Sequence, residues 1–336
     1  MARYSLDPSG DLVAALEPQT GEAGGSGRAR QLAKWLVPVV VSAAAFALLL
    51  SRIDFGEVLS HADGRVGAVM IPAVLLYGAV SLWIEAQTLN LLASPSSQSL
   101  DKWTCAKIKA ASYPLGLLNY ALGAGGLTYL LRRRGNLGIS NAAGIVILIA
   151  LFDLGFLLLL SAFGAVLLST QTIALQASAI ALAVAAILVG FALLRANFSL
   201  GPLDRLRDLE LFRAARETEI SRLAILAVLR LGFVISFIML CGTALLVFDI
   251  HVPLGDLVIG VAAVSLVASL PIAVAGLGTG QVAFVFMFRH WGSPEILLAS
   301  NLALSAGLIV MRAGVGLLFA GEFTREALAA ARETRD

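Results

Sequence analysis

The sequence predicts an all-α polytopic membrane protein with about six transmembrane helices and two re-entrant helical hairpins, arranged in inverted repeats. The first observation is a shortage of charge, because Asp, Glu, Lys and Arg make up 14% of 336 residues, against about 25% in a soluble domain. The second is a hydrophobic share of 59% and a mean hydropathy of +0.89. Together they exclude a large soluble enzyme, a disordered chain, a coiled coil and a disulfide scaffold.

The N-terminal residues 1–33 differ from the rest of the chain. Residues 5–27 are polar and include the Gly/Ser-rich run GEAGGSG at 21–27, where a signal peptide would carry an apolar segment. We therefore expect residues 1–33 to form a disordered cytoplasmic tail. The expected membrane repeats cover residues 34–170 and 171–322, and a second cytoplasmic tail covers 323–336.

The third observation is a series of apolar runs with few or no charges. About 20 apolar helical residues cross a bilayer core of about 30 Å. The polar patch at 169–172 divides an apolar stretch that is too long for one helix. Spans are predicted at 35–51, 66–84, 139–168, 173–194, 223–248 and 296–320.

Two further charge-free stretches are broken by proline and glycine. Ala110–Leu131 contains Pro114 and four glycines, and Leu257–Phe288 contains Pro271 and a glycine cluster. With a cytoplasmic N-terminus, most of the 24 lysines and arginines fall on the cytoplasmic side only if both stretches enter and leave on the same side. The two stretches are therefore predicted to be re-entrant hairpins, one from each face of the membrane.

A short internal similarity relates the two broken stretches. LGAGGLTYL at 122–130 aligns with LGTGQVAFV at 277–285, and under the same offset the flanking spans also align. Each half then crosses the membrane three times, so the second half is inverted. Inverted repeats with broken helices near the membrane midplane are typical of transporters.

The glycines of these stretches have two interpretations. In the first, they let the backbone turn at membrane depth, and the free N–H groups of a following half-helix face a cavity suited to an anionic headgroup. In the second, they allow close helix packing and bind nothing. The glycines concerned are Gly123, Gly125, Gly126, Gly276, Gly278 and Gly280, with a half-helix expected from Gln281.

Four charged residues lie within predicted spans or at their ends. They are Glu85, Asp153, Arg230 and Arg312. Because buried charges in a membrane pair with one another, we expect Asp153 to pair with Arg312 or Arg230, leaving one guanidinium for a lipid phosphate. A purely structural ion pair is the alternative. Glu85 is expected to extend to the interface.

Other chemistry has little support in the sequence. Cys105 and Cys241 lack metal-ligand spacing and are expected to be reduced and structural, and His61, His251 and His290 are scattered in loops. The chain has no GxxxxGK[ST], HExxH or GxSxG motif. We expect no enzyme activity, no metal, no cofactor and no nucleic-acid partner.

Two segments resemble a known family. SLPIAVAGLGTGQVAFVFMF (269–288) is similar to the C-terminal signature of the lysylphosphatidylglycerol synthase transmembrane, flippase-like family, where a G-x-G turn and usually an Arg-Glu pair follow a proline. NYALGAGGLTYLLRRRG (119–135) resembles its first-half motif. The resemblance covers roughly residues 35–322. This chain has Gly280-Gln281 in place of Arg-Glu and no acidic residue at Gly126.

The resemblance implies a membrane domain that binds lipids or moves them between leaflets. Full-length synthases add a soluble aminoacyl-transfer domain, and only a short tail follows the last predicted span here, so synthase chemistry is not expected on this chain. We expect a multi-pass inner-membrane protein with cytoplasmic termini that translocates or binds an amphipathic lipid, anionic or lipid-linked. The candidate substrate-binding residues are Asn119, Gly123, Gly125, Gly126, Asp153, Arg230, Gly276, Gly278, Gly280, Gln281 and Arg312.

Two alternatives stay open at this point. One is a membrane scaffold that holds a lipid-modifying enzyme. The other is a small-molecule transporter coupled to protons through Asp153. The expected partners are membrane lipids, and a homo-oligomer or a lipid-modifying enzyme partner is left open.

Overall fold

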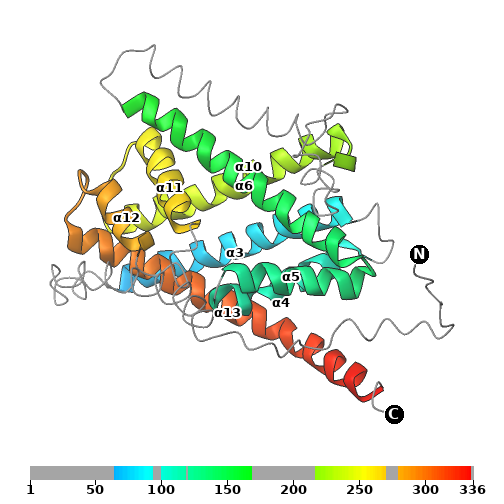
Figure 1. Ribbon diagram of the computed structural model, residues 1–336. Coiled ribbons are helices and arrows are strands. Elements are labelled where there is room, and N and C mark those ends of the chain that lie inside the picture. Colours follow the sequence, from blue (N-terminus) through cyan, green and yellow to red (C-terminus); the bar gives the residue numbers. More distant parts are fainter. Residues whose placement is uncertain (1–63, 94–99, 119, 169–215, 270–278, 334–336) are drawn as a thin grey trace, which may run out of the picture.

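A computed structural model describes residues 64–93, 100–118, 120–168, 216–269 and 279–333. Within these ranges the chain is helical and contains no strand. These ranges comprise four long helices and four short ones, in the order long, short, short, long, which occurs twice (Figure 1). The helices are α3 Gly64–Ala93, α4 Lys102–Leu118, α5 Tyr120–Gly135, α6 Ile139–Leu168, α10 Ile220–Val247, α11 Leu254–Ser269, α12 Thr279–Phe288 and α13 Pro294–Glu333.

In the described part of the chain, four helices are long and apolar enough to cross a membrane. These segments are Val66–Ala93, Ile139–Ala162, Ile220–Val247 and Pro294–Phe319, each 24 to 28 residues long. They confirm the helices predicted near 66–84, 139–168, 223–248 and 296–320. The predicted spans at 35–51 and 173–194 lie outside the described residues.

Large apolar side chains cover the outside of these helices. Leu76 on α3 is 67% exposed and Leu318 on α13 is 78% exposed. Exposed apolar surface of this extent is unfavourable in water and favourable in lipid. The long helices are therefore membrane-embedded.

The structure corrects the end of the first described span. Helix α3 continues past Glu85 to Ala93, and Glu85 is 4% exposed rather than extended to the interface. The reason is that two cations inside the bundle pair with its carboxylate. Helix α13 likewise continues to Glu333, so residues 323–333 of the expected C-terminal tail are helical.

The four short helices form two pairs, α4 with α5 and α11 with α12. Residues 102–118 and 120–135 pack against each other and are joined at residue 119, and α11 packs against α12. Gly123, Gly125 and Gly126 lie within α5 and do not form the turn that the sequence predicted. A Cβ atom on Gly123 would lie 2.7 Å from the Cα atom of Gly116, so close packing of α4 against α5 accounts for this glycine.

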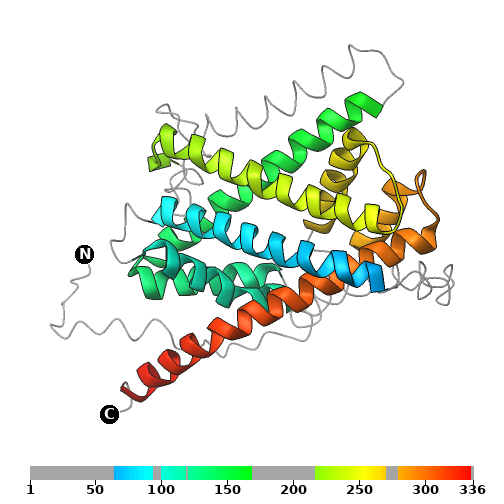
Figure 2. The same cartoon turned by 180° about the vertical axis from the view of Figure 1, so that it is seen from behind.

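The two halves of the described chain pack crosswise. Helix α13 of the second half packs on α4 of the first, and α6 of the first half packs on α11 of the second. Helices α3 and α10 lie side by side and run in opposite directions (Figures 1 and 2). The α4–α5 pair and the α11–α12 pair occupy opposite ends of the bundle in both views.

A polar layer separates two hydrophobic cores. On α3, Tyr77 belongs to one core and Ala86 to the other, and Ser81 and Glu85 lie between them. On α10, Leu226 and Val234 belong to different cores, with Arg230 between them. The candidate site lies in this layer.

Candidate functional site

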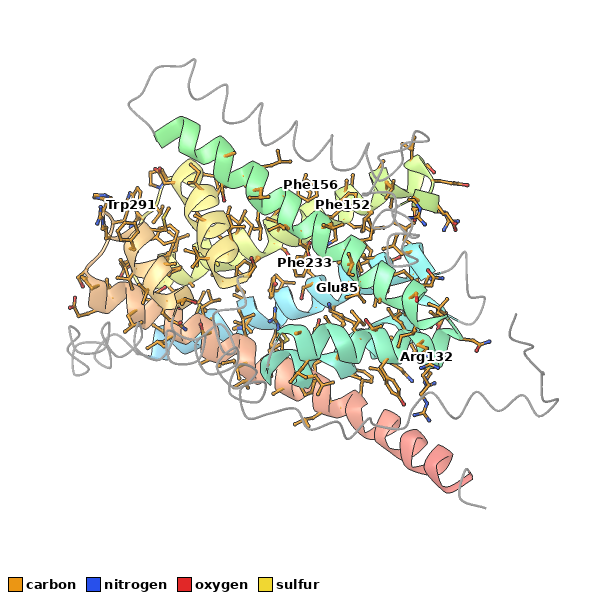
Figure 3. All side chains as sticks on the ribbon, viewed as in Figure 1. Glu85, Arg132, Phe152, Phe156, Phe233 and Trp291 are labelled. Atoms are coloured by element: carbon orange, nitrogen blue, oxygen red, sulfur yellow. The ribbon has the colours of Figure 1, made fainter. Side chains whose placement is uncertain are left out.

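Five charged side chains from five helices define the polar layer. Glu85 comes from α3, Lys109 from α4, Asp153 from α6, Arg230 from α10 and Arg312 from α13. Figure 3 shows Glu85 and Phe233 in the middle of the bundle, between Arg132 at one end and Trp291 at the other. Ionisable groups inside a membrane bundle mark functional sites more often than they stabilise a fold.

Arg230 holds both carboxylates of the layer. Its Nε and Nη2 atoms donate to Oδ1 and Oδ2 of Asp153 at 2.7 and 2.9 Å, a bidentate pair. Its Nη1 atom lies 3.4 Å from Oε1 of Glu85, and the guanidinium stacks 4.3 Å from the centroid of the Phe233 ring. Arg230 is fully buried, which is tolerable only because these partners surround it.

Lys109 completes the pairing of Glu85. Its Nζ atom lies 3.2 Å from Oε2 of Glu85. The two carboxylates therefore have two protein cations as partners, and this part of the layer is electrically neutral.

Arg312 is the fifth charge, and its neighbours are aromatic. Its guanidinium lies 5.9 Å from the centroid of the Tyr113 ring and beside the hydroxyl of Tyr77. Within the described part of the chain, no carboxylate forms an ion pair with Arg312.

A cavity of about 250 Å³ opens beside the polar layer on the side of the α4–α5 pair. Glu85, Lys109, Asp153 and Arg312 contribute charge to its wall, and Ser81, Ser112 and Tyr113 contribute hydroxyl groups. Gly116 and Gly123 also line it, so the close contact of α4 with α5 forms part of the wall.

A second cavity, of about 390 Å³, lies on the side of α11. Its wall is mainly aliphatic and aromatic, from Leu154, Leu157, Phe237, Ile238 and Val261 among others. The two cavities share four lining residues, Ala150, Asp153, Phe233 and Arg312. A cavity with charged and hydroxyl groups in its wall and a mainly apolar cavity therefore meet at Asp153 and Arg312.

The structure brings together part of the set that the sequence predicted. Gly123, Asp153 and Arg312 line the first cavity, and Arg230 lies behind Asp153. The predicted ion pair of Asp153 is confirmed, and its partner is Arg230. Gly125, Gly126, Gly280 and Gln281 line neither cavity, and Asn119, Gly276 and Gly278 lie outside the described residues.

Sequence reasoning missed Tyr77, Ser81, Lys109 and Tyr113. A signal for them was present, because Tyr77, Ser81 and Glu85 follow one another at intervals of four and therefore share one face of α3. Lys109 and Tyr113 share one face of α4 for the same reason. Polar residues at this spacing in an apolar helix indicate a face turned to a polar interior.

The described residues contain no group of three or more His, Cys, Asp or Glu side chains that could hold a metal ion. The lining residues of the site carry charges, hydroxyl groups and aromatic rings. These are groups that can contact and orient a charged ligand.

Four span-length helices with a charged layer between them, all within the described residues, define a polytopic helical membrane protein. A family model described as "Lysylphosphatidylglycerol synthase TM region" matches residues 35–318, so the chain belongs to this family. Comparison with the curated proteins gave no match, and comparison with the solved structures gave none either.

Proposed function

We propose that the protein binds an amphipathic membrane lipid and moves its headgroup between leaflets through the polar layer. The observation that carries the proposal is that a cavity with charged groups in its wall and a mainly apolar cavity meet at Asp153 and Arg312. A lipid has one polar and one apolar part, so it matches both cavities, whereas a small polar solute matches only the first. No bond is made or broken in this activity.

The arrangement of the helices supports a transport cycle. The order of long, short, short and long helices occurs twice, with α3 antiparallel to α10. We interpret the two halves as inverted repeats and the two short pairs as re-entrant hairpins from opposite faces. In such transporters, binding sites lie near the midplane, where irregular backbone lines a cavity.

The distribution of basic residues supports an orientation in the inner membrane. Lys102, Lys107, Arg132 and Arg133 lie at the open end of the α4–α5 pair, where Trp103 is 60% exposed. Basic residues favour the cytoplasmic side, and tryptophan favours the interface. We therefore place this end, and both chain termini, in the cytoplasm.

The pairing of Asp153 argues against a proton-coupled solute carrier. Both oxygens of Asp153 accept hydrogen bonds from one buried guanidinium, so a proton on this carboxylate would break the bidentate pair. The lipid proposal needs no proton on this group.

The proposal is tested by leaflet exchange in liposomes that contain the purified protein. The probe is phosphatidylglycerol with a fluorescent acyl chain, and dithionite reports the fraction in the outer leaflet. Ala150→Trp places a bulky ring where the two cavities meet, and we expect it to slow exchange about tenfold.

The matched control is Val310→Trp, which adds the same ring on the outer surface of α13, where Val310 is 71% exposed. We expect its exchange rate to stay within about twofold of the wild type. Wild-type liposomes that exchange the probe no faster than empty ones would refute the proposal.

A further inference from the structure

Counted over the described residues, the charged layer carries one excess positive charge. Glu85 and Asp153 supply the negative charges, and Lys109, Arg230 and Arg312 supply the positive ones. Three of the four charges that line the first cavity directly already have a protein partner. The fourth is Arg312.

The paired charges leave little for a ligand to bind. Both oxygens of Asp153 accept hydrogen bonds from Arg230, and each oxygen of Glu85 lies within 3.4 Å of a protein cation. A cationic ligand would therefore have to displace Arg230 or Lys109 from its carboxylate. Displacing Arg230 would leave a fully buried guanidinium without its partners, which is strongly unfavourable.

Arg312 is placed to bind an anion. It lines both cavities, and its described neighbours are the ring of Tyr113 and the hydroxyl of Tyr77 rather than a carboxylate. A guanidinium offers a planar fork of N–H donors that fits a phosphate, and the phenol hydroxyls beside it can also donate to phosphate oxygens. One negative charge at this point would bring the layer to neutrality.

We propose that the site selects lipids whose headgroup carries one net negative charge, a phosphodiester without an amine, and that Arg312 is the residue that sets this selection. The inference rests on the proposed function and specifies its substrate class. This selection disfavours lysylphosphatidylglycerol, the lipid named in the family's description. Lysylphosphatidylglycerol carries a phosphate and two amines, hence one net positive charge, and the described lining residues include no unpaired carboxylate to receive an amine.

The test compares three lipids that share one fluorescent acyl chain and differ only in the headgroup. They are phosphatidylglycerol (one negative charge), phosphatidylethanolamine (neutral) and lysylphosphatidylglycerol (one positive charge). Leaflet exchange is measured for each lipid with the wild type, Arg312→Gln, Arg312→Lys and Arg312→Glu. Thermal unfolding in detergent shows which variants are folded.

We expect the wild type to exchange phosphatidylglycerol about tenfold faster than lysylphosphatidylglycerol. Arg312→Gln should remove this preference, Arg312→Lys should keep part of it, and Arg312→Glu should reverse it. Where Arg312→Glu does not fold, the comparison of the Gln and Lys variants decides.

The outcomes separate the inference from the function on which it rests. A wild type that exchanges all three lipids equally, or prefers lysylphosphatidylglycerol, overturns the charge selection and leaves lipid transport standing. If folded Arg312→Gln exchanges all three lipids more slowly by the same factor, the charge selection is also overturned, because Arg312 would then act on the structure alone. Absence of exchange for every lipid overturns the proposed function and the inference together.

Discussion

Arg230 shows how one residue can hold a polar layer inside a membrane protein. Arg230 is 0% exposed, and an unpaired ion at such a position is strongly unfavourable. Its guanidinium, however, contacts both carboxylates of the layer. Because Asp153 and Glu85 come from different helices, Arg230 also ties α10 to α6 and α3. Because both carboxylates are paired with Arg230, they do not compete with a ligand for Arg312.

Replacing Arg230 with Met should therefore destabilise the protein by about 3–5 kcal/mol, because it leaves the buried carboxylate of Glu85 and the half-buried carboxylate of Asp153 near each other with only Lys109 as a partner. Asp153→Asn in the same chain should recover part of this loss, since it removes one of those charges. The measurement is the free energy of unfolding in mixed micelles.

The matched control for Arg230→Met is Arg289→Met, at an exposed position after α12, with an expected change within about 0.5 kcal/mol. Equal stability of Arg230→Met and its Asp153→Asn double variant would contradict the account of the ion pair.

At the scale of the elements, the α4–α5 pair depends on the absence of side chains at one contact. A Cβ atom on Gly123 would meet the backbone of Gly116 at 2.7 and 3.1 Å, whereas one on Gly125 would meet nothing within 4 Å. Both glycines are in the same helix and only two positions apart. Alanine substitutions at these two positions therefore distinguish the effect of close packing from that of helix propensity.

Gly123→Ala should destabilise the protein by about 1–3 kcal/mol, because the backbone of α4 must move away from α5. Gly125→Ala should stabilise it by up to about 1 kcal/mol, because alanine favours a helix and has room here. Thermal unfolding of the two variants in one detergent measures the difference. A shift of the same sign for both would rule out the close contact as the reason for Gly123.

The sequence predicted such hairpins but not the use of these glycines. Glycine in an apolar run is compatible with a turn or with a close helix contact, and local sequence contains nothing that distinguishes the two. The distinction depends on Gly116 of α4, seven positions earlier, packing opposite Gly123 of α5.

At the scale of the whole molecule, the two short helix pairs occupy opposite ends of the bundle (Figures 1 and 2). Arg132 and Trp291 are correspondingly far apart in Figure 3. If the halves are inverted repeats, the ends of these pairs reach water on opposite faces of the membrane.

Cysteine labelling tests this topology. Asn136→Cys follows α5 and His290→Cys follows α12, both at exposed positions, in a chain whose buried Cys105 and Cys241 are replaced by Ala. A membrane-impermeant maleimide should label His290→Cys from outside intact cells and Asn136→Cys only in inverted vesicles. Labelling of both sites from one face would contradict the inverted arrangement.

The sequence by itself determined the class of this protein and the positions of four described spans. Both follow from composition and from the length of apolar runs, which are local properties and need no knowledge of packing. The sequence also identified four charged residues in the spans, because a charge is conspicuous in an apolar helix.

Only the tertiary structure decided how those charges are used. The sequence left Arg230 and Arg312 equivalent as partners of Asp153 and assigned Glu85 to the interface, and it did not connect Lys109 with any of them. Helices far apart in the chain bring these groups within 3.4 Å of one another, so their pairing depends on contacts across the bundle. Arg312 has no ion-pair partner among the described residues for the same reason, because the described helices around it supply no opposite charge that is not already paired.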